Sequence, residues 1–209
     1  MSLYTLVLFL HVSGAIGIFA GVGIWLFGLS ALQRARRVEQ VRALAWLIIV
    51  TIPFMVLSLV LLGVAGLDMA IFTWGLQTPW ILVSLVSLTL YAPINMLVLD
   101  PRMRTILAQA GEAPDGPLPD ELYARTHDPI LGTAAHTLAT VLLGVVFLMT
   151  TKPSLATSIL VMGVAFFLGL FSSLPLWRAA HIRARHTSAH ASGADGDPFL
   201  KKTIWTRKW

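Results

Sequence analysis

The stretch "LYTLVLFLHVSGAIGIFAGVGIWLFGLSAL", residues 3–32, decides the fold of this chain. It contains no Asp, Glu, Lys or Arg and is followed at once by the basic segment "QRARR". A bilayer core of about 30 Å needs roughly 20 apolar residues at 1.5 Å each, so this stretch is long enough to cross a membrane as one helix. No positively charged segment precedes the apolar run, which favours a retained transmembrane helix over a signal peptide.

Four more segments have the same character, so we predict an all-α protein, a polytopic bundle of five transmembrane helices over residues 1–177. The composition agrees, with 56% hydrophobic and only 12% charged residues. Asp68–Thr78 is apolar but short and is expected to form an interfacial helix, and the Pro- and Gly-rich connection at 101–128 is expected to be a loop. The predicted spans cover residues 3–32, 44–67, 79–100, 129–151 and 154–177.

The basic residues orient the predicted bundle. They gather in the connections after the first and third spans and in the tail at 178–209, which alone holds seven basic and two acidic residues. All three segments fall on one side of the membrane if there are five spans, which predicts the N-terminus outside and the C-terminus inside. The net charge of +5 resides in this tail, so it indicates attraction to anionic lipids rather than nucleic-acid binding.

Two histidines are the ionisable residues inside the predicted spans, His11 in the first and His136 in the fourth. Ionisable residues in a bilayer are costly and are functional candidates by default. Gly14, Gly17 and Gly21 form a stripe beside His11, where another helix or a flat ligand could approach the backbone closely. Either the stripe serves helix packing alone, or His11 ligates a haem iron and the glycines make room for the porphyrin.

His136 lies among small residues and is the candidate for a second metal or haem ligand, with a threonine hydroxyl fixing its tautomer. Counting from the span ends, His11 and His136 differ in depth by roughly 8 Å, so one shared haem or two separate sites both fit. Asn95 is expected to hydrogen-bond across the bundle. The chain has no cysteine, and its methionines are scattered, so copper binding through thioethers is a weaker alternative to haem.

Three motifs carry a family resemblance: "LHVSGAIGIFAGVGIWL" near the N-terminus, "LDPRMR" after the third span and "FLMTTKPS" closing the fourth. They resemble a family of bacterial integral membrane proteins that is similar to the CopD-like and HemJ-like group, whose first helix carries an LHxxxA or LHxxG pattern. The resemblance implies haem b at His11, or copper uptake through histidines and methionines. The HemJ-like pattern has an intramembrane lysine that this chain lacks, which argues against protoporphyrinogen oxidation.

The leading expectation is therefore a haem-b protein of the bacterial inner membrane, acting in electron transfer or haem handling. His11 is expected to be the axial ligand and His136 a second ligand or a partner, with Gly14, Gly17 and Gly21 lining the cofactor. The competing expectation is a non-catalytic subunit that packs against other membrane subunits through its glycine stripe. The third is copper handling. Whether the protein is an enzyme is left open by the sequence.

Overall fold

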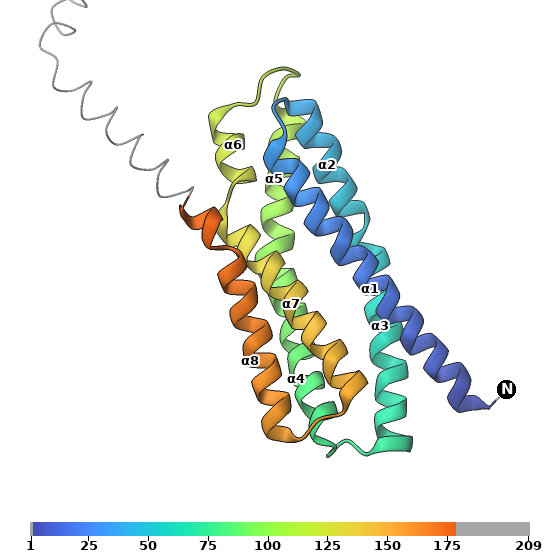
Figure 1. The fold of residues 1–209 in the computed structure, drawn as a ribbon. Helices are drawn as coiled ribbons and strands as arrows, with labels where there is room; N and C mark the ends of the chain where they lie inside the picture. Colours follow the sequence, from blue (N-terminus) through green and yellow to red (C-terminus); the bar gives the residue numbers. More distant parts are fainter. Residues whose placement is uncertain (1, 179–209) are drawn as a thin grey trace, which may run out of the picture. The chain divides into compact units, whose positions relative to one another are not determined.

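The computed structural model describes residues 2–178, apart from the side chains of residues 91 and 92. Residues up to Ser173 form one compact unit, and the description below concerns that unit. Its regular elements are helices, of which η1 and η2 are π-helical turns (Figure 1). They are α1 (Leu3–Arg34), α2 (Val38–Val50), α3 (Ile52–Met69), η1 (Ala70–Trp74), α4 (Pro79–Ile94), η2 (Asn95–Leu99), α5 (Asp100–Glu112), α6 (Asp120–Thr126), α7 (Pro129–Thr151) and α8 (Leu155–Ser172).

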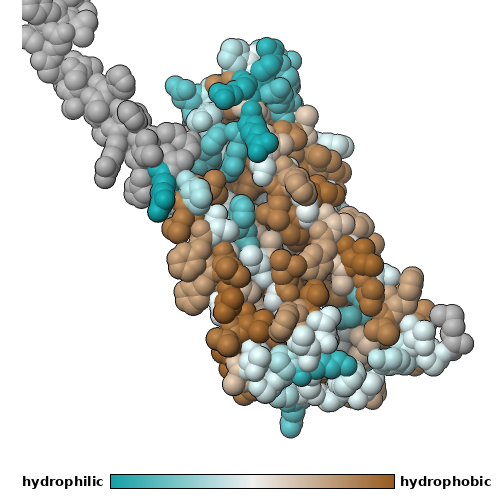
Figure 2. Space-filling model, viewed as in Figure 1, coloured by the Kyte–Doolittle hydropathy of each residue, from teal (hydrophilic) through white to brown (hydrophobic). Residues whose placement is uncertain are grey.

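Five helical stretches of the described chain are long and apolar enough to cross a membrane, which confirms the predicted five-helix, all-α membrane fold. Apolar side chains cover the middle of the face shown in Figure 2, and hydrophilic ones gather where α2, α5 and α6 meet. The orientation in the membrane stays a prediction. The predicted lipid-binding tail lies outside the described residues except for Arg178. The stretches are Leu3–Arg34, Val38–Trp74, Pro79–Glu112, Asp120–Thr151 and Leu155–Arg178.

The second stretch is longer than the predicted 44–67, and the predicted interfacial helix at Asp68–Thr78 is wrong. α2, α3 and η1 follow one another with no break from Val38 to Trp74. No residue between Leu67 and Trp74 disfavours a helix, so the chain continues until Gly75, whose φ of 86° suits glycine. The segment after Leu67 is thus the end of a membrane helix rather than a separate element.

The third stretch also runs past its predicted end at residue 100, and the predicted loop at 101–128 is largely helical. α4 passes through η2 into α5, which ends at Glu112. Pro101 does not stop the helix because it lies in the first turn of α5, directly after the π-helical turn η2, where the hydrogen-bond ladder is already rearranged. Within 101–128 the residues outside helices are Ala113 to Pro119, which precede α6, and His127 and Asp128, which follow it.

One arginine fastens that loop to α2. The Arg42 guanidinium donates to the Ala110 carbonyl at 2.9 Å, to the Ala113 carbonyl at 3.0 Å and to the Asp115 carboxylate at 3.0 Å. The Val38 N–H donates to the Gly116 carbonyl at 3.0 Å. These bonds bring the connections after the first and third spans together at one end of the bundle, which we call the basic end.

Many of the best-buried side chains lie near the basic end. Leu32, Val38, Val41 and Met103 are fully buried where α1, α2 and α5 meet. Away from this end many large apolar side chains are exposed, and Phe72 of η1 is 79% exposed. A lipid environment covers such surfaces without cost, whereas in water they would favour aggregation.

Candidate functional site

His11 is held by α3 from across the bundle. Its Nδ1 lies 3.0 Å from the carbonyl oxygen of Leu62. A carbonyl can only accept, so Nδ1 carries the proton, and the neutral ring keeps a lone pair on Nε2. Among the described residues Nε2 has no hydrogen-bond partner. Histidines that ligate metals show this arrangement, with one ring nitrogen donating to a carbonyl and the other left for the metal.

The ring fits against α3 because residue 66 has no side chain. A Cβ atom on Gly66 would lie 2.9 Å from both Cε1 and Nδ1 of His11, closer than real contacts allow. Gly66 lies one helical turn after Leu62. The same face of α3 therefore makes room for the ring and accepts its hydrogen bond. Neither residue stands out in the sequence, because their role depends on the pairing of α1 with α3.

His11 lines two apolar cavities that share Leu62, Leu88 and Met149. The larger is about 600 Å³, within the range of small-molecule sites, and lies between α1 and α7. It opens to the lipid-facing surface, because Ile16 in its wall is 65% exposed. The smaller is about 80 Å³ and extends toward α4 and η1. We call the two together the His11 cavity.

A cation and two indoles lie at the end of the bundle opposite the basic end. The Lys152 ammonium is 3.9 Å from the Trp74 ring centroid and 6.0 Å from that of Trp80, and the two rings meet edge to face. Both tryptophans line the smaller part of the His11 cavity. Lys152 has φ 50° and ends α7, so its side chain begins at a left-handed helix cap. The sequence placed these tryptophans at an interface but did not connect them with His11.

His136 has the same local chemistry in a different place. Its Nδ1 lies 2.8 Å from the Gly132 carbonyl one turn earlier on α7, so this carbonyl fixes the tautomer in place of the predicted threonine hydroxyl. His136 lines none of the cavities that hold His11. Met149 of the same helix does. The part of α7 that lines the His11 cavity therefore comes after the turn that carries His136, and the predicted depth difference of roughly 8 Å stays a prediction.

The space beside the glycine stripe is filled by α3. A Cβ on Gly14 would lie 2.5 Å from the Leu62 nitrogen, one on Gly17 would overlap the Ser58 hydroxyl, and one on Gly21 would overlap Met55. The sequence left open whether the glycine stripe serves helix packing or makes room for a porphyrin. At these three glycines the structure shows close helix packing. The predicted slot beside His11 is inside the α1–α3 interface, and the open space is on the α7 side of the ring.

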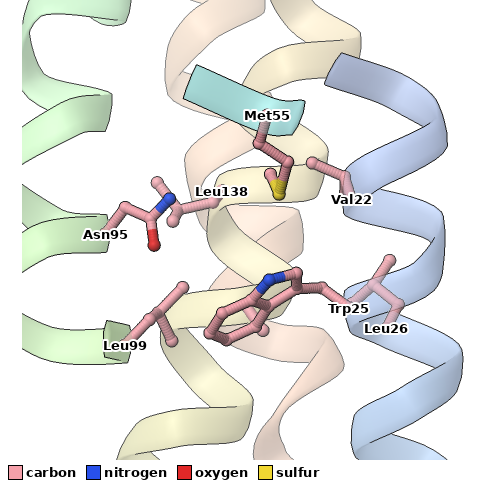
Figure 3. Close-up of a pocket in the computed structure, with 8 residues that line it drawn as sticks. Val22, Trp25, Leu26, Met55, Asn95, Leu99 and Leu138 are labelled. Atoms are coloured by element: carbon pink, nitrogen blue, oxygen red, sulfur yellow. The ribbon is translucent and has the colours of Figure 1, made fainter. Parts of the chain in front are cut away.

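Figure 3 shows a second polar position nearer the basic end, lined by Trp25, Met55 and Asn95. The Trp25 indole N–H is buried and has no hydrogen-bond partner among the described residues. Asn95, the first residue of η2, makes no side-chain hydrogen bond to them either, so its predicted bond across the bundle is not formed. The cavity of about 20 Å³ has room for about one water molecule. It is too small for a cofactor.

Metal sites made from several charged side chains are not found in residues 2–178. No group of three or more His, Asp or Glu there could hold an ion. Of the methionines, Met69 and Met149 line the His11 cavity, and Met55 lines the small cavity of Figure 3. An iron ion at His11 would therefore have to bring most of its ligands with it, as it does in a porphyrin.

Comparison with known proteins gives one match. No curated protein and no solved structure matches the chain. The likeness to the CopD-like and HemJ-like group has no counterpart among these results. A family model described as "Predicted integral membrane protein (DUF2269)" matches residues 5–153, which include His11, Met149 and Lys152. That range covers well over half of the sequence, so the chain belongs to the DUF2269 family of predicted integral membrane proteins.

Proposed function

We propose that this integral membrane protein binds haem b in the His11 cavity, where Nε2 of His11 would hold the iron. The observation that carries the proposal is the bond from Nδ1 of His11 to the Leu62 carbonyl, which leaves Nε2 with its lone pair free. Without this bond, an imidazole in lipid would need other hydrogen-bond partners for both of its ring nitrogens. Bound haem b would supply one-electron redox chemistry, suited to electron transfer or haem handling in a bacterial inner membrane.

The donors around the cavity suit an amphiphilic macrocycle. The walls are mostly aliphatic, which fits the apolar faces of a porphyrin, and the Met149 thioether is a candidate for the second iron ligand. The Lys152 ammonium, stacked on Trp74 at the end of the smaller part of the cavity, is a candidate partner for a propionate. Met149 takes the place that the sequence gave to His136, because it shares both parts of the cavity with His11.

The packing bears on the two other expectations. A structural subunit was expected to dock through the glycine stripe, but α3 already covers Gly14, Gly17 and Gly21. Copper handling would need several soft ligands at one place, and the smaller part of the His11 cavity offers Met69 and Met149 beside His11, so copper is kept as the second candidate ligand of this cavity. The tail keeps its proposed role in holding anionic lipids on the strength of its composition alone, with seven basic residues and interleaved tryptophans.

The test is the absorbance spectrum of the full chain, purified in mild detergent from haem-replete cells. A Soret band at about one haem per chain is expected, and His11→Ala should abolish it. His136→Ala removes the same side chain from α7 and is the matched control, which should keep the band. A colourless wild-type protein, or a Soret band that His11→Ala leaves unchanged, would refute haem ligation at His11.

A second measurement separates loss of haem from loss of folding. Titration of the haem-free protein with haemin should quench tryptophan fluorescence, because Trp74 and Trp80 line the cavity. In His11→Ala, the haemin concentration needed for half-maximal quenching should rise at least tenfold. The melting temperature should stay within a few degrees of the wild-type value. Met149→Leu should retain haem but shift the spectrum of the reduced form, because the thioether no longer reaches the iron.

A further inference from the structure

A groove of about 690 Å³ lies between the last turns of α1 and the first turns of α2, at the basic end. One part of it is apolar, and Phe27 there is 80% exposed. The other part is polar and ends at the Arg34 guanidinium. The side chains that matter here are Phe27, Ala31 and Arg34 of α1 with Gln40, Ala43 and Leu44 of α2.

Arg34 and Arg36 are both exposed, and neither forms an ion pair with an acidic side chain among the described residues, but of the two only Arg34 lines the groove. Five arginines nearby are each paired with a carboxylate, so much of their charge is neutralised locally. The pairs are Arg37–Glu39, Arg42–Asp115, Arg102–Asp128, Arg104–Asp100 and Arg125–Glu121.

Gln40 adds hydrogen-bond donors to the polar part of the groove. Its Oε1 accepts the backbone N–H of Arg36 at 3.0 Å, which fixes the amide orientation. The Nε2 group therefore keeps its two N–H donors for another acceptor. A guanidinium and an amide N–H₂ in one groove, without a carboxylate lining it, suit a phosphate.

We propose that this groove binds an anionic phospholipid, with the headgroup phosphate at Arg34 and Gln40 and an acyl chain along Phe27 and Leu44. The seven residues from Phe27 to Arg34 correspond to about 10 Å of helix, enough to reach from the headgroup layer into the hydrocarbon. The indole of Trp46 on α2 is 59% accessible and lies about 9 Å of helix beyond Gln40, where a side chain that favours the interface would sit just below the headgroup. A free phosphate would leave the apolar half of the groove unused.

The experiment is native mass spectrometry of the full chain in detergent, titrated with phosphatidylglycerol or with phosphatidylcholine. Tighter binding of phosphatidylglycerol is expected in the wild type. Arg34→Gln should weaken phosphatidylglycerol binding about fivefold, the effect of one cation near a lipid surface. Arg104→Gln removes an equal charge from the same end but from an ion pair, and it should leave the affinity unchanged.

A second variant tests the groove without changing the charge. Ala43 is exposed on α2, so Ala43→Phe should fold normally and fill the groove, again weakening phosphatidylglycerol binding. Three results would overturn the proposal. They are equal losses in Arg34→Gln and Arg104→Gln, no loss in Arg34→Gln, or displacement of the lipid by inorganic phosphate at matched concentration.

Discussion

Alanine in place of Gly14 should push α1 and α3 apart. The new Cβ would lie 2.5 Å from the Leu62 nitrogen and 2.8 Å from the Ser58 carbonyl oxygen, against about 3.5 Å for an ordinary contact. These two atoms belong to one turn of the α3 backbone, so no rotamer change can relieve the overlap. The helices must separate by about 1 Å, over the most extensive helix pair in the bundle.

The size of the effect follows from comparison with Gly23 on the same helix. A Cβ there would have no atom within 4 Å, so Gly23→Ala should gain up to about 1 kcal/mol from helix propensity. Overpacking at Gly14 should cost about 1–3 kcal/mol. Both substitutions gain the same helix propensity, so we expect the free energies of unfolding of the two variants to differ by the overpacking cost alone, about 1–3 kcal/mol. Titration of the detergent-solubilised protein with sodium dodecyl sulfate measures this difference.

Gly17 gives an internal check of the reasoning. There the overlap is with the Ser58 side chain rather than with backbone. Ser58→Gly should therefore restore much of the stability lost in Gly17→Ala, and it should not restore Gly14→Ala. Equal stability of Gly14→Ala and Gly23→Ala would refute the backbone-contact argument.

Three further predictions use the same unfolding titration or limited proteolysis. Gly169→Ala on α8 should lose about 1–3 kcal/mol because its Cβ would meet the α7 backbone, whereas Gly163→Ala, with open space, should lose nothing. Arg42→Lys should make the 113–119 loop several times more sensitive to protease, because an ammonium cannot form the several hydrogen bonds of the guanidinium. Asp115→Asn, which alters only an exposed ion pair, should change the protease sensitivity little. Trp25→Phe should lower the free energy of unfolding by about 1–2 kcal/mol, against about 3–5 kcal/mol for Trp25→Ala. Equal losses in the two variants would mean that the buried N–H of Trp25 is hydrogen-bonded in the wild type.

The candidate site was only partly predictable. His11 could be found from the sequence because an ionisable ring in an apolar run is costly wherever the helix packs. Its partners could not, since Leu62 contributes a backbone carbonyl and Gly66 contributes the absence of a side chain. The sequence also could not show that Met149 rather than His136 lines the cavity around His11, because this depends on which turns of α7 face α1.

The ends of the helices were also only partly predictable from the sequence. The apolar runs gave the five spans, but α5 extends beyond the third span as a polar helix whose buried face packs on α2. That extension is stable because Met103 and Ile106 find partners on another helix, and hydropathy along a single segment does not report such partners.

The sequence by itself determined that this is a five-helix membrane protein with two intramembrane histidines. In a bilayer each segment must satisfy its own backbone, so crossing the membrane is a property of about 20 consecutive residues. Only the tertiary structure decided that α3 fills the glycine stripe, that Leu62 fixes the His11 tautomer and that the open cavity faces α7. These outcomes depend on which side chains meet across fifty or more residues of chain, and packing geometry rather than local composition selects them.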